Sequence, residues 1–265
     1  MPNGLITLTT DFGQSDHFVG TMKGVILGIA PRARIVDITH EIAPYELNEA
    51  AFVIAQAWRF FPKGTIHVIV VDPGVGSSRR PILAEAEGQF FIAPDNGVLS
   101  MIYDEVRHKV RVISNTKLAS KHVSRTFHGR DIFAPAAGHL ARGIPPARFG
   151  KLIQDYVRSF LVKPTQVSRR EWSGAVLKVD RFGNLITNLR IDDFPDVKTR
   201  PIELRVGLER IHRLALTYAE TAIGELSAIV GSSGYIEVAA NQASASKILG
   251  CTAGSPVELE IFYDS

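Results

Sequence analysis

The chain has 265 residues, of which 45% are hydrophobic and 22% charged, proportions that are ordinary for a globular protein of one large or two smaller domains. The formal net charge of +3 is spread along the chain without a long basic run, which argues against a nucleic-acid partner. A single cysteine excludes internal disulfides and CxxC motifs. The sequence shows no signal peptide and no apolar run of 18 residues, so a cytoplasmic protein without a membrane partner is predicted.

The first part of the chain alternates strand and helix signals. Strands are predicted at 4–10, 33–39, 65–72 and 89–97, and helices at 16–31, 45–61 and 123–143. The 65–72 segment is rich in β-branched residues, which is typical of a strand buried on both faces. Strands that alternate with helices imply right-handed crossovers. Residues 1–155 are therefore predicted to form an α/β domain with a mostly parallel central sheet.

The pattern changes after about residue 155. Residues 156–171 lack periodicity and contain proline and charge, which indicates a linker. Short strands then follow at 173–189, 201–207, 210–220, 226–241 and 255–263, with one helical segment at 244–250. Glycine and serine separate these strands, so residues 172–265 are predicted to form a smaller, mostly β domain, either β-barrel-like or a sandwich.

The first polar motif, TDFGQSD at 10–16, contains the DFG triplet of protein kinases. A kinase needs a Gly-rich loop, a strand lysine and an HRD loop before its DFG, and only ten residues precede Asp11. The motif instead presents Asp11 at the carboxyl end of a strand, where ligands bind in open α/β sheets. A local turn is the alternative reading of this and of each later motif.

The motif VDPGVGSSRR at 71–80 presents Asp72 at the end of another strand. Its glycines suggest a phosphate loop, but the GK[ST] ending is missing. Arg79 can pair with Asp72, hold a ligand anion or simply lie on the surface. FHGRD at 127–131 offers His128, which could be catalytic or structural, and Asp131, which could cap the following helix. Asp11, Asp72 and His128 could in principle hold a metal, although no metal-ligand spacing is present.

Two motifs of the second part carry further polar groups. DRFGN at 180–184 offers an acid and an amide that could bind an ammonium group or an amide edge. GSSGYIEVAAN at 231–241 offers the hydroxyls of Ser232 and Ser233, which suit a carboxylate. Tight turns between strands are the alternative for both motifs.

Taken in order, TDFG, DPGVGSSRR, APDNG, FHGRDIFAPAA, DRFGNxxTN and GSSGYIEVAxN resemble the S-adenosyl-L-methionine (SAM) hydroxide adenosyltransferases, relatives of the SAM-dependent fluorinase and chlorinase. The resemblance spans the whole chain. It implies an α/β domain followed by a β-barrel domain, and a homotrimer that binds SAM between the N-terminal domain of one subunit and the C-terminal domain of its neighbour. It also implies that water replaces the sulfonium at the ribose C5′ and gives adenosine and L-methionine, without a metal or a cofactor.

The same resemblance implies roles for the substrate-binding residues. Asp11 resembles the carboxylate that grips the ribose hydroxyls, and Tyr45 the aromatic side chain that covers the sugar. Asp16 and Asp180 resemble partners of the methionine ammonium. The segment that receives the methionine carboxylate corresponds to Ser232 and Ser233, where the fluorinase has an arginine in place of Ser233.

The adenine side of the pocket is implied in the same way. Asn184 resembles the amide that faces the adenine edge. Glu237 and the backbone around Ala239 are expected to complete this pocket.

Hydrolytic members of the family carry an Asp–Arg–His set, which Asp72, Arg79 and His128 match. Asp72 and His128 are expected to orient a water molecule and take its proton, with Arg79 fixing Asp72. The halogenases have tyrosine in place of Asp72, and a carboxylate there would repel a halide. A SAM-dependent halogenase, a non-catalytic SAM or adenosine sensor and a metal-dependent hydrolase remain the alternatives.

Overall fold

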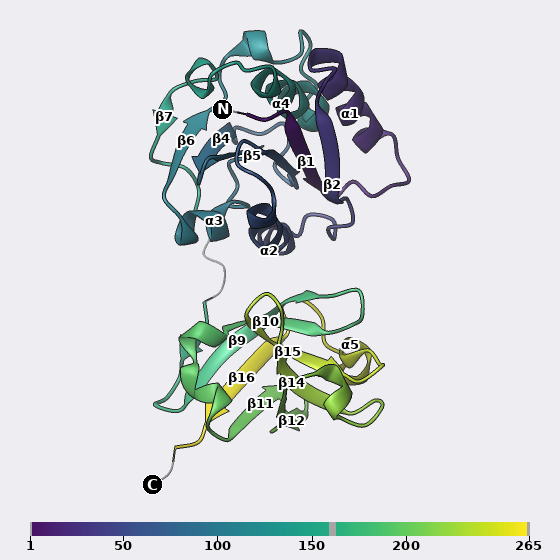
Figure 1. The fold of residues 1–265 in the computed structure, drawn as a ribbon, viewed down its shortest axis with the longest axis vertical. Helices are drawn as coiled ribbons and strands as arrows, with labels where there is room; N and C mark the ends of the chain where they lie inside the picture. The colour runs from purple at the N-terminus through teal and green to yellow at the C-terminus, as the bar shows by residue number, and fades with distance from the viewer. Residues whose placement is uncertain (1, 159–162, 264–265) are drawn as a thin grey trace. The chain divides into compact units, whose positions relative to one another are not determined.

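The computed structural model describes residues 2–158 and 163–263, and the chain divides into two compact units, Met1–Leu161 and Val162–Ser265 (Figure 1). The linker predicted at 156–171 includes residues 159–162, which lie outside the described residues. The later part of that range contains a short strand, β8 (Thr165–Gln166), which pairs with β9. No helix in the described parts of the chain is both long and apolar enough to span a membrane.

The first unit is built on a seven-stranded sheet in the order β2-β1-β3-β5-β4-β6-β7. Its strands are β1 (Leu5–Thr10), β2 (Arg34–Thr39), β3 (Ile66–Val70), β4 (Pro81–Ala86), β5 (Gln89–Pro94), β6 (His108–Val112) and β7 (Leu152–Ile153). The four predicted strands of this region correspond to β1, β2, β3 and β5.

The sheet is mixed, so the prediction of a mostly parallel sheet is not confirmed. β2, β1, β3 and β5 are parallel, whereas β4, β6 and β7 join through antiparallel pairings. The sequence reading missed β4 and β6 and therefore expected only crossover connections. Glu87 and Gly88 both have positive φ, at 48° and 78°, and form the two-residue hairpin turn that makes β4 antiparallel to β5.

Helices cover both faces of this sheet (Figure 1). On one face lie α1 (Phe18–Ile29) and α4 (Ala134–Ala141), and on the other α2 (Leu47–Ala57) and α3 (Ser100–Glu105). Short 3-10 helices are η1 (Trp58–Phe60), η2 (Thr116–Leu118) and η4 (Pro146–Arg148).

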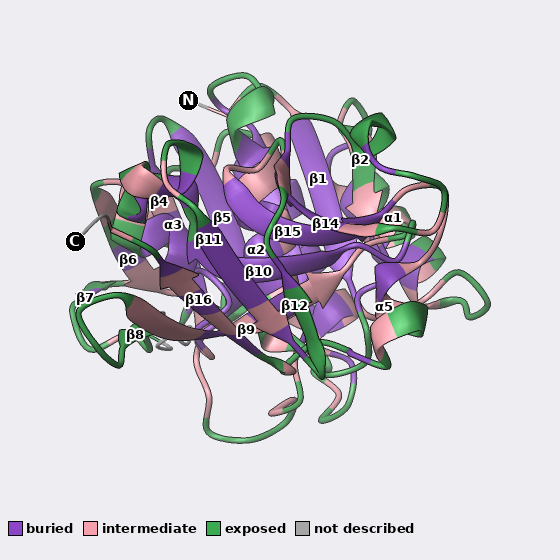
Figure 2. Ribbon diagram, turned by 90° about the horizontal axis from the view of Figure 1, so that it is seen from below, coloured by how far each residue is buried: buried purple, intermediate pink, exposed green. Residues whose placement is uncertain are grey.

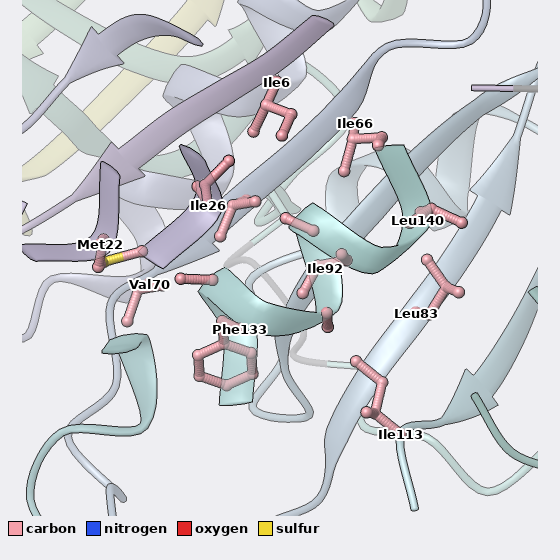
Figure 3. Packing of buried hydrophobic residues seen from close by; sticks show 14 of the residues in the cluster. Ile6, Met22, Ile26, Ile66, Val70, Leu83, Ile92, Ile113, Phe133 and Leu140 are labelled. Atoms are coloured by element: carbon pink, nitrogen blue, oxygen red, sulfur yellow. The ribbon is translucent and has the colours of Figure 1, made fainter. Parts of the chain in front are cut away.

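Each face of the sheet has its own apolar core. Figure 3 shows the first, in which Ile6 of β1, Met22 and Ile26 of α1 and Phe133 pack together. In β3, Ile66, Val68 and Val70 belong to this core while Ile69 contributes to the core on the opposite face. The prediction that the 65–72 strand is buried on both faces is therefore confirmed, and Figure 2 shows β1 and β5 as buried ribbons.

The second unit is a curled nine-stranded sheet in the order β12-β11-β16-β9-β10-β15-β14-β13, with β8 beside β9. Its strands are β9 (Glu171–Val179), β10 (Leu185–Arg190), β11 (Ile202–Val206), β12 (Glu209–Ile211), β13 (Leu214–Ala215), β14 (Leu226–Val230), β15 (Tyr235–Ala240) and β16 (Pro256–Ile261). The helical segments are α5 (Ala245–Leu249), η5 (Ile191–Asp193), η6 (Pro195–Lys198) and η7 (Tyr218–Glu220). The order ends at β12 and β13, so the predicted β-barrel-like domain is a curled half-barrel around a single apolar core.

Candidate active site

A cavity of about 340 Å³ lies at the carboxyl ends of β1 and β3. Asp11 follows β1 directly, and Asp72 comes two residues after the end of β3. The lining residues are Asp11, Phe12, Phe18, Pro44, Tyr45, Val70, Asp72, Val75, Thr126, His128 and Gly129. The sequence motifs at 10–16, 71–80 and 127–131 therefore meet at one edge of the sheet, as expected for parallel strands.

The loop after β3 folds back so that Arg79 reaches Asp72. Successive turns are closed by Val75 N–H donating to the Asp72 carbonyl at 3.1 Å and by Ser77 N–H donating to the Gly74 carbonyl at 3.1 Å. Arg79 Nε then donates to Asp72 Oδ1 at 2.9 Å, and its Nη2 donates to Oδ2. The two side chains are only 9% and 5% exposed, so this two-point ion pair is held away from bulk water.

Arg79 lies behind the cavity rather than in its lining. Its Nη2 also donates to His128 Nδ1 at 2.6 Å, and its guanidinium carbon lies 5.3 Å from the centre of the Phe133 ring. Asp72 and His128 both line the cavity. The guanidinium therefore joins the two lining side chains from behind and fixes the angle between them.

His128 stands at the start of a π-helical turn, Gly129–Phe133, which runs directly into α4. Such turns are frequent at functional sites because they re-aim one side chain of a helix. Burial and then the charge of Arg79 hold the pKa of His128 below its usual value of 6.5. The imidazole is therefore neutral at neutral pH.

Asp131 does not cap α4, the helix that follows it, although the sequence left this structural role open. Its Oδ2 accepts a hydrogen bond from Ser124 N–H at 2.8 Å, and Arg130 binds both of its oxygens. Asp131 thus anchors the loop before His128. The same loop touches the Asp72 loop so closely at Gly76 that an added Cβ would overlap the Arg125 carbonyl oxygen.

On the other side of the cavity, Asp11 is tied to a strained residue. Asp11 Oδ2 accepts a hydrogen bond from Tyr45 N–H at 3.0 Å, and Tyr45 has a positive φ of 70°. The Tyr45 side chain is 70% exposed and lines the cavity. Strain of this kind at a cavity wall is typical of a functional position. Asp16 is exposed on the same loop and is not among the lining residues.

Sequence reasoning missed a polar network that begins at the buried side chains of Thr10 and His40, next to Asp11. Thr10 Oγ1 contacts His40 Nδ1 at 2.8 Å, and His40 Nε2 lies 3.1 Å from Asp37 Oδ1. Asp37 in turn binds Lys23, and Gly13 N–H donates to the His40 carbonyl at 2.8 Å. These contacts fix the start of the TDFG loop. Only the polar residues at the ends of β1 and β2 hinted at them in the sequence.

In the second unit, Asp180 and Asn184 form one turn. Asp180 Oδ1 accepts hydrogen bonds from Phe182 N–H at 2.8 Å and Asn184 N–H at 2.9 Å, and Oδ2 accepts one from Asn184 Nδ2 at 2.9 Å. The tight turn that was the alternative for this motif is therefore present. Phe182 at its tip is 78% exposed.

Glu237 of β15 lies near this turn. Burial and the neighbouring Asp180 raise the pKa of Glu237 to about 7, while a hydrogen bond from Tyr218, another residue that the sequence reasoning missed, opposes the rise. A Cβ on Gly231 would overlap the Glu237 carboxyl group, so a larger residue there would require the Glu237 side chain to move.

The remaining predicted substrate-binding residues lie in β15 or in the turn that precedes it. Ser232 is exposed and Ser233 half-buried in the turn between β14 and β15, and Ala239 is buried in β15.

A larger hollow of about 530 Å³ lies at the opposite end of β1, beside Asn3 and Gly4. Its lining includes Arg32 and Arg142 but no acid or histidine. Because ligands of open α/β sheets bind at the carboxyl ends of the strands, the smaller cavity is the candidate active site. Within residues 2–158 and 163–263, no cluster of three or more His, Cys, Asp or Glu side chains is placed to hold a metal ion.

A carboxylate, a guanidinium and an imidazole joined at the strand ends beside a small cavity are the features of an α/β enzyme that acts on a small molecule. Family models of the N- and C-terminal domains of SAM hydroxide adenosyltransferases match residues 6–150 and 174–258. The chain belongs to the SAM hydroxide adenosyltransferase family. The resemblance inferred from the motifs is thereby confirmed.

Individual relatives agree with this assignment. The (R)-S-adenosyl-L-methionine hydrolase of Salinispora tropica is 37% identical over 263 residues and 96% of each chain. A fluorinase of Actinoplanes sp. is 30% identical over 91% of this chain and 92% of its own. The crystal structure of an uncharacterized conserved protein from Thermotoga maritima matches with a TM-score of 0.89 and 38% identity, over 96% of this chain and 99% of that one.

Proposed function

We propose that this protein hydrolyses S-adenosyl-L-methionine at the ribose C5′, with water as the nucleophile, to give adenosine and L-methionine. Four relatives of 34–37% identity over nearly the whole chain are named (R)-S-adenosyl-L-methionine hydrolases. The observation that carries the proposal is the Asp72 carboxylate in the cavity wall, paired with Arg79 and beside His128.

The chemistry requires little more than positioning. The sulfonium leaves as a neutral thioether, so its departure needs neither an acid nor a cofactor. Holding a water molecule in line with the C5′–S bond is worth up to about 7–11 kcal/mol. Asp11 and the Tyr45 side chain would hold the ribose, and Asp180, Asn184 and Glu237 the rest of the substrate.

Free hydroxide is not stored at such a site. Water has a pKa of about 15.7, while a carboxyl has one of about 3.9 and an imidazole about 6.5. Deprotonation before attack would therefore be uphill by about 12 kcal/mol or more. The proton leaves the water as the C–O bond forms, which is general-base catalysis.

A carboxylate in the wall disfavours the halide reaction of the related fluorinases. Two negative charges about 4 Å apart repel by about 4 kcal/mol where the effective dielectric constant is about 20. Water carries no such penalty, and it can donate a hydrogen bond to the Asp72 carboxylate.

We further propose that the complete site forms in a homotrimer, from the first unit of one subunit and the second unit of its neighbour. This is supported by the division of the predicted substrate residues between the two units. Mixing inactive Asp72→Asn and Asp180→Asn subunits should then restore about a quarter of the wild-type sites. Sites built within one subunit would give no recovery.

The test of the reaction uses H₂¹⁸O and both sulfonium configurations of SAM, with EDTA throughout and with or without chloride. Adenosine carrying ¹⁸O, together with methionine, is the expected product and should not depend on halide or chelator. A 5′-halo-5′-deoxyadenosine product would indicate a halogenase, and bound but unchanged SAM would indicate a sensor. Activity that EDTA abolishes would indicate a metal-dependent hydrolase.

A further inference from the structure

We infer that His128 takes no proton in the reaction: the ring is held neutral with its hydrogen on Nε2, and Asp72 is the proton acceptor. The chemical part of this inference rests on the proposed function. The position of the hydrogen does not, because it is a property of the free protein.

The contact with Arg79 decides which ring nitrogen is bare. Arg79 Nη2 lies 2.6 Å from His128 Nδ1. A guanidinium has only N–H donors and does not lose its proton in proteins, so it cannot accept a hydrogen bond. Nδ1 must therefore be the acceptor, and the hydrogen of the neutral ring is on Nε2.

The other ring nitrogen, Nε2, carries the hydrogen of the neutral ring and so has no lone pair with which to accept a proton. The loop that precedes His128 is fixed by Asp131, whose Oδ2 accepts a hydrogen bond from Ser124 N–H at 2.8 Å.

Neither nitrogen can therefore serve as a base while Arg79 keeps its contact with the ring. A proton accepted by the ring would have to sit on Nδ1 and would face the Arg79 guanidinium, donor against donor. The charged groups that act on the ring are Arg79, which disfavours its protonation, and Asp72 and Asp131, which favour it, and burial tips the balance toward the neutral form.

Asp72 remains as the acceptor that lines the cavity. Its oxygens each receive one N–H of Arg79, and a carboxylate oxygen has a further lone pair for the water. In the step, the water oxygen forms the bond to C5′, the C5′–S electron pair leaves on the sulfur of methionine, and one water proton passes to Asp72. His128 is a positioning residue that holds Arg79, and through it Asp72, in place.

The hydrogen position can be read directly from the free protein. Histidine ¹⁵N labelling and long-range ¹H–¹⁵N correlation between pH 6 and 8 distinguish bare from protonated ring nitrogens, and comparison with His128→Asn assigns the signals. The expected pattern is a bare Nδ1 and a protonated Nε2. A hydrogen on Nδ1, or a doubly protonated ring, would overturn the inference. In Arg79→Met, which removes the donor, signals of the other tautomer should appear.

Kinetics then separate the two residues. His128→Asn offers an amide oxygen to Arg79, so kcat should fall by about tenfold while the acid limb of the pH profile remains. Asp72→Asn should lower kcat by at least about a thousandfold, within the range of a lost general base. An equal loss in both variants, with the acid limb gone from His128→Asn, would assign the proton to His128. A wild-type protein that leaves SAM intact but shows a bare Nδ1 would refute the proposed function alone.

Discussion

His67 should make the first unit lose stability as the pH falls. The residue is fully buried in β3, where Nδ1 contacts Thr7 Oγ1 at 2.7 Å and Nε2 contacts Gln89 Oε1 at 2.7 Å. Gln89 Nε2 already donates to the Trp58 and Phe61 carbonyls, so its Oε1 is the acceptor and His67 Nε2 carries the hydrogen. A second proton on this ring would face the Thr7 hydroxyl without solvent.

Burial lowers the pKa of His67 to about 4 from its usual 6.5. As the pH falls, the unfolded chain therefore binds the proton before the folded protein does. The contribution to stability is complete above pH 6.5 and is lost toward pH 4. At pH 5 the loss is about 2 kcal/mol, and at most about 3.4 kcal/mol is lost at lower pH.

The assay is urea unfolding between pH 7 and 4.5, read by the fluorescence of Trp58. The chain has two tryptophans, so a Trp172→Phe background leaves Trp58 as the only reporter. Trp58 packs against Phe91 with ring centres 5.6 Å apart, and Phe91 stacks on His67 at 4.9 Å. His67→Gln in this background removes the titrating group, and His122→Gln is the matched exposed control.

The wild-type and His122→Gln curves should fall in parallel, and the His67→Gln curve should fall by about 2 kcal/mol less between pH 7 and 5. The offset of His67→Gln at pH 7 reports lost packing and is not the readout. If all three curves keep the same slope, His67 is not the group that titrates on unfolding, and the reasoning from burial is refuted.

Glu237→Gln should remove part of the pH dependence of the free energy of unfolding of the second unit, measured by the fluorescence of Trp172. Because the pKa of Glu237 is about 7, the folded protein holds this proton more tightly than the unfolded chain does. The wild type should therefore lose stability as the pH rises from about 5 to 7. Gly76→Ala places a methyl group against a backbone carbonyl at a φ of 78° and should cost at least about 1–2 kcal/mol in urea unfolding, with kcat lowered about a hundredfold because the loops of the site separate. Tyr45→Gly relieves a positive φ of 70° and should stabilise the fold by about 1 kcal/mol in thermal unfolding. In SAM kinetics the same variant should raise KM about tenfold, because the sugar loses its cover while Asp11 keeps its backbone partner.

Local signals in the sequence were sufficient to find the pieces of the site. An apolar strand that ends in an acid, followed by proline or glycine, placed Asp11 and Asp72 at strand ends, and both line the cavity. The same logic could not find β4 and β6. Their pairing depends on a two-residue turn at Glu87 and Gly88, a part of the chain for which no element was predicted, and on contacts between segments far apart in the chain.

The second unit shows the same division between local and long-range signals. The DRFGN motif predicted a turn or a ligand site, and the hydrogen bonds of Asp180 show the turn. The raised pKa of Glu237 arises from burial and from Asp180, a residue 57 positions away in the sequence. No local sequence pattern indicates such a pairing, so the raised pKa of Glu237 could not be predicted without the three-dimensional structure.

The histidines of the first unit explain why residue type alone could not assign the base. His67 and His128 both accept at Nδ1, and both have their pKa lowered by burial. The difference lies in the donor: Thr7 offers a hydroxyl that can turn around, whereas Arg79 offers a guanidinium that cannot. A hydroxyl partner permits either tautomer, so only Gln89 settles the state of His67. The charged partner of His128 settles it alone, and it is the same group that binds Asp72, so the residue that orients the acceptor also prevents the histidine from competing with it.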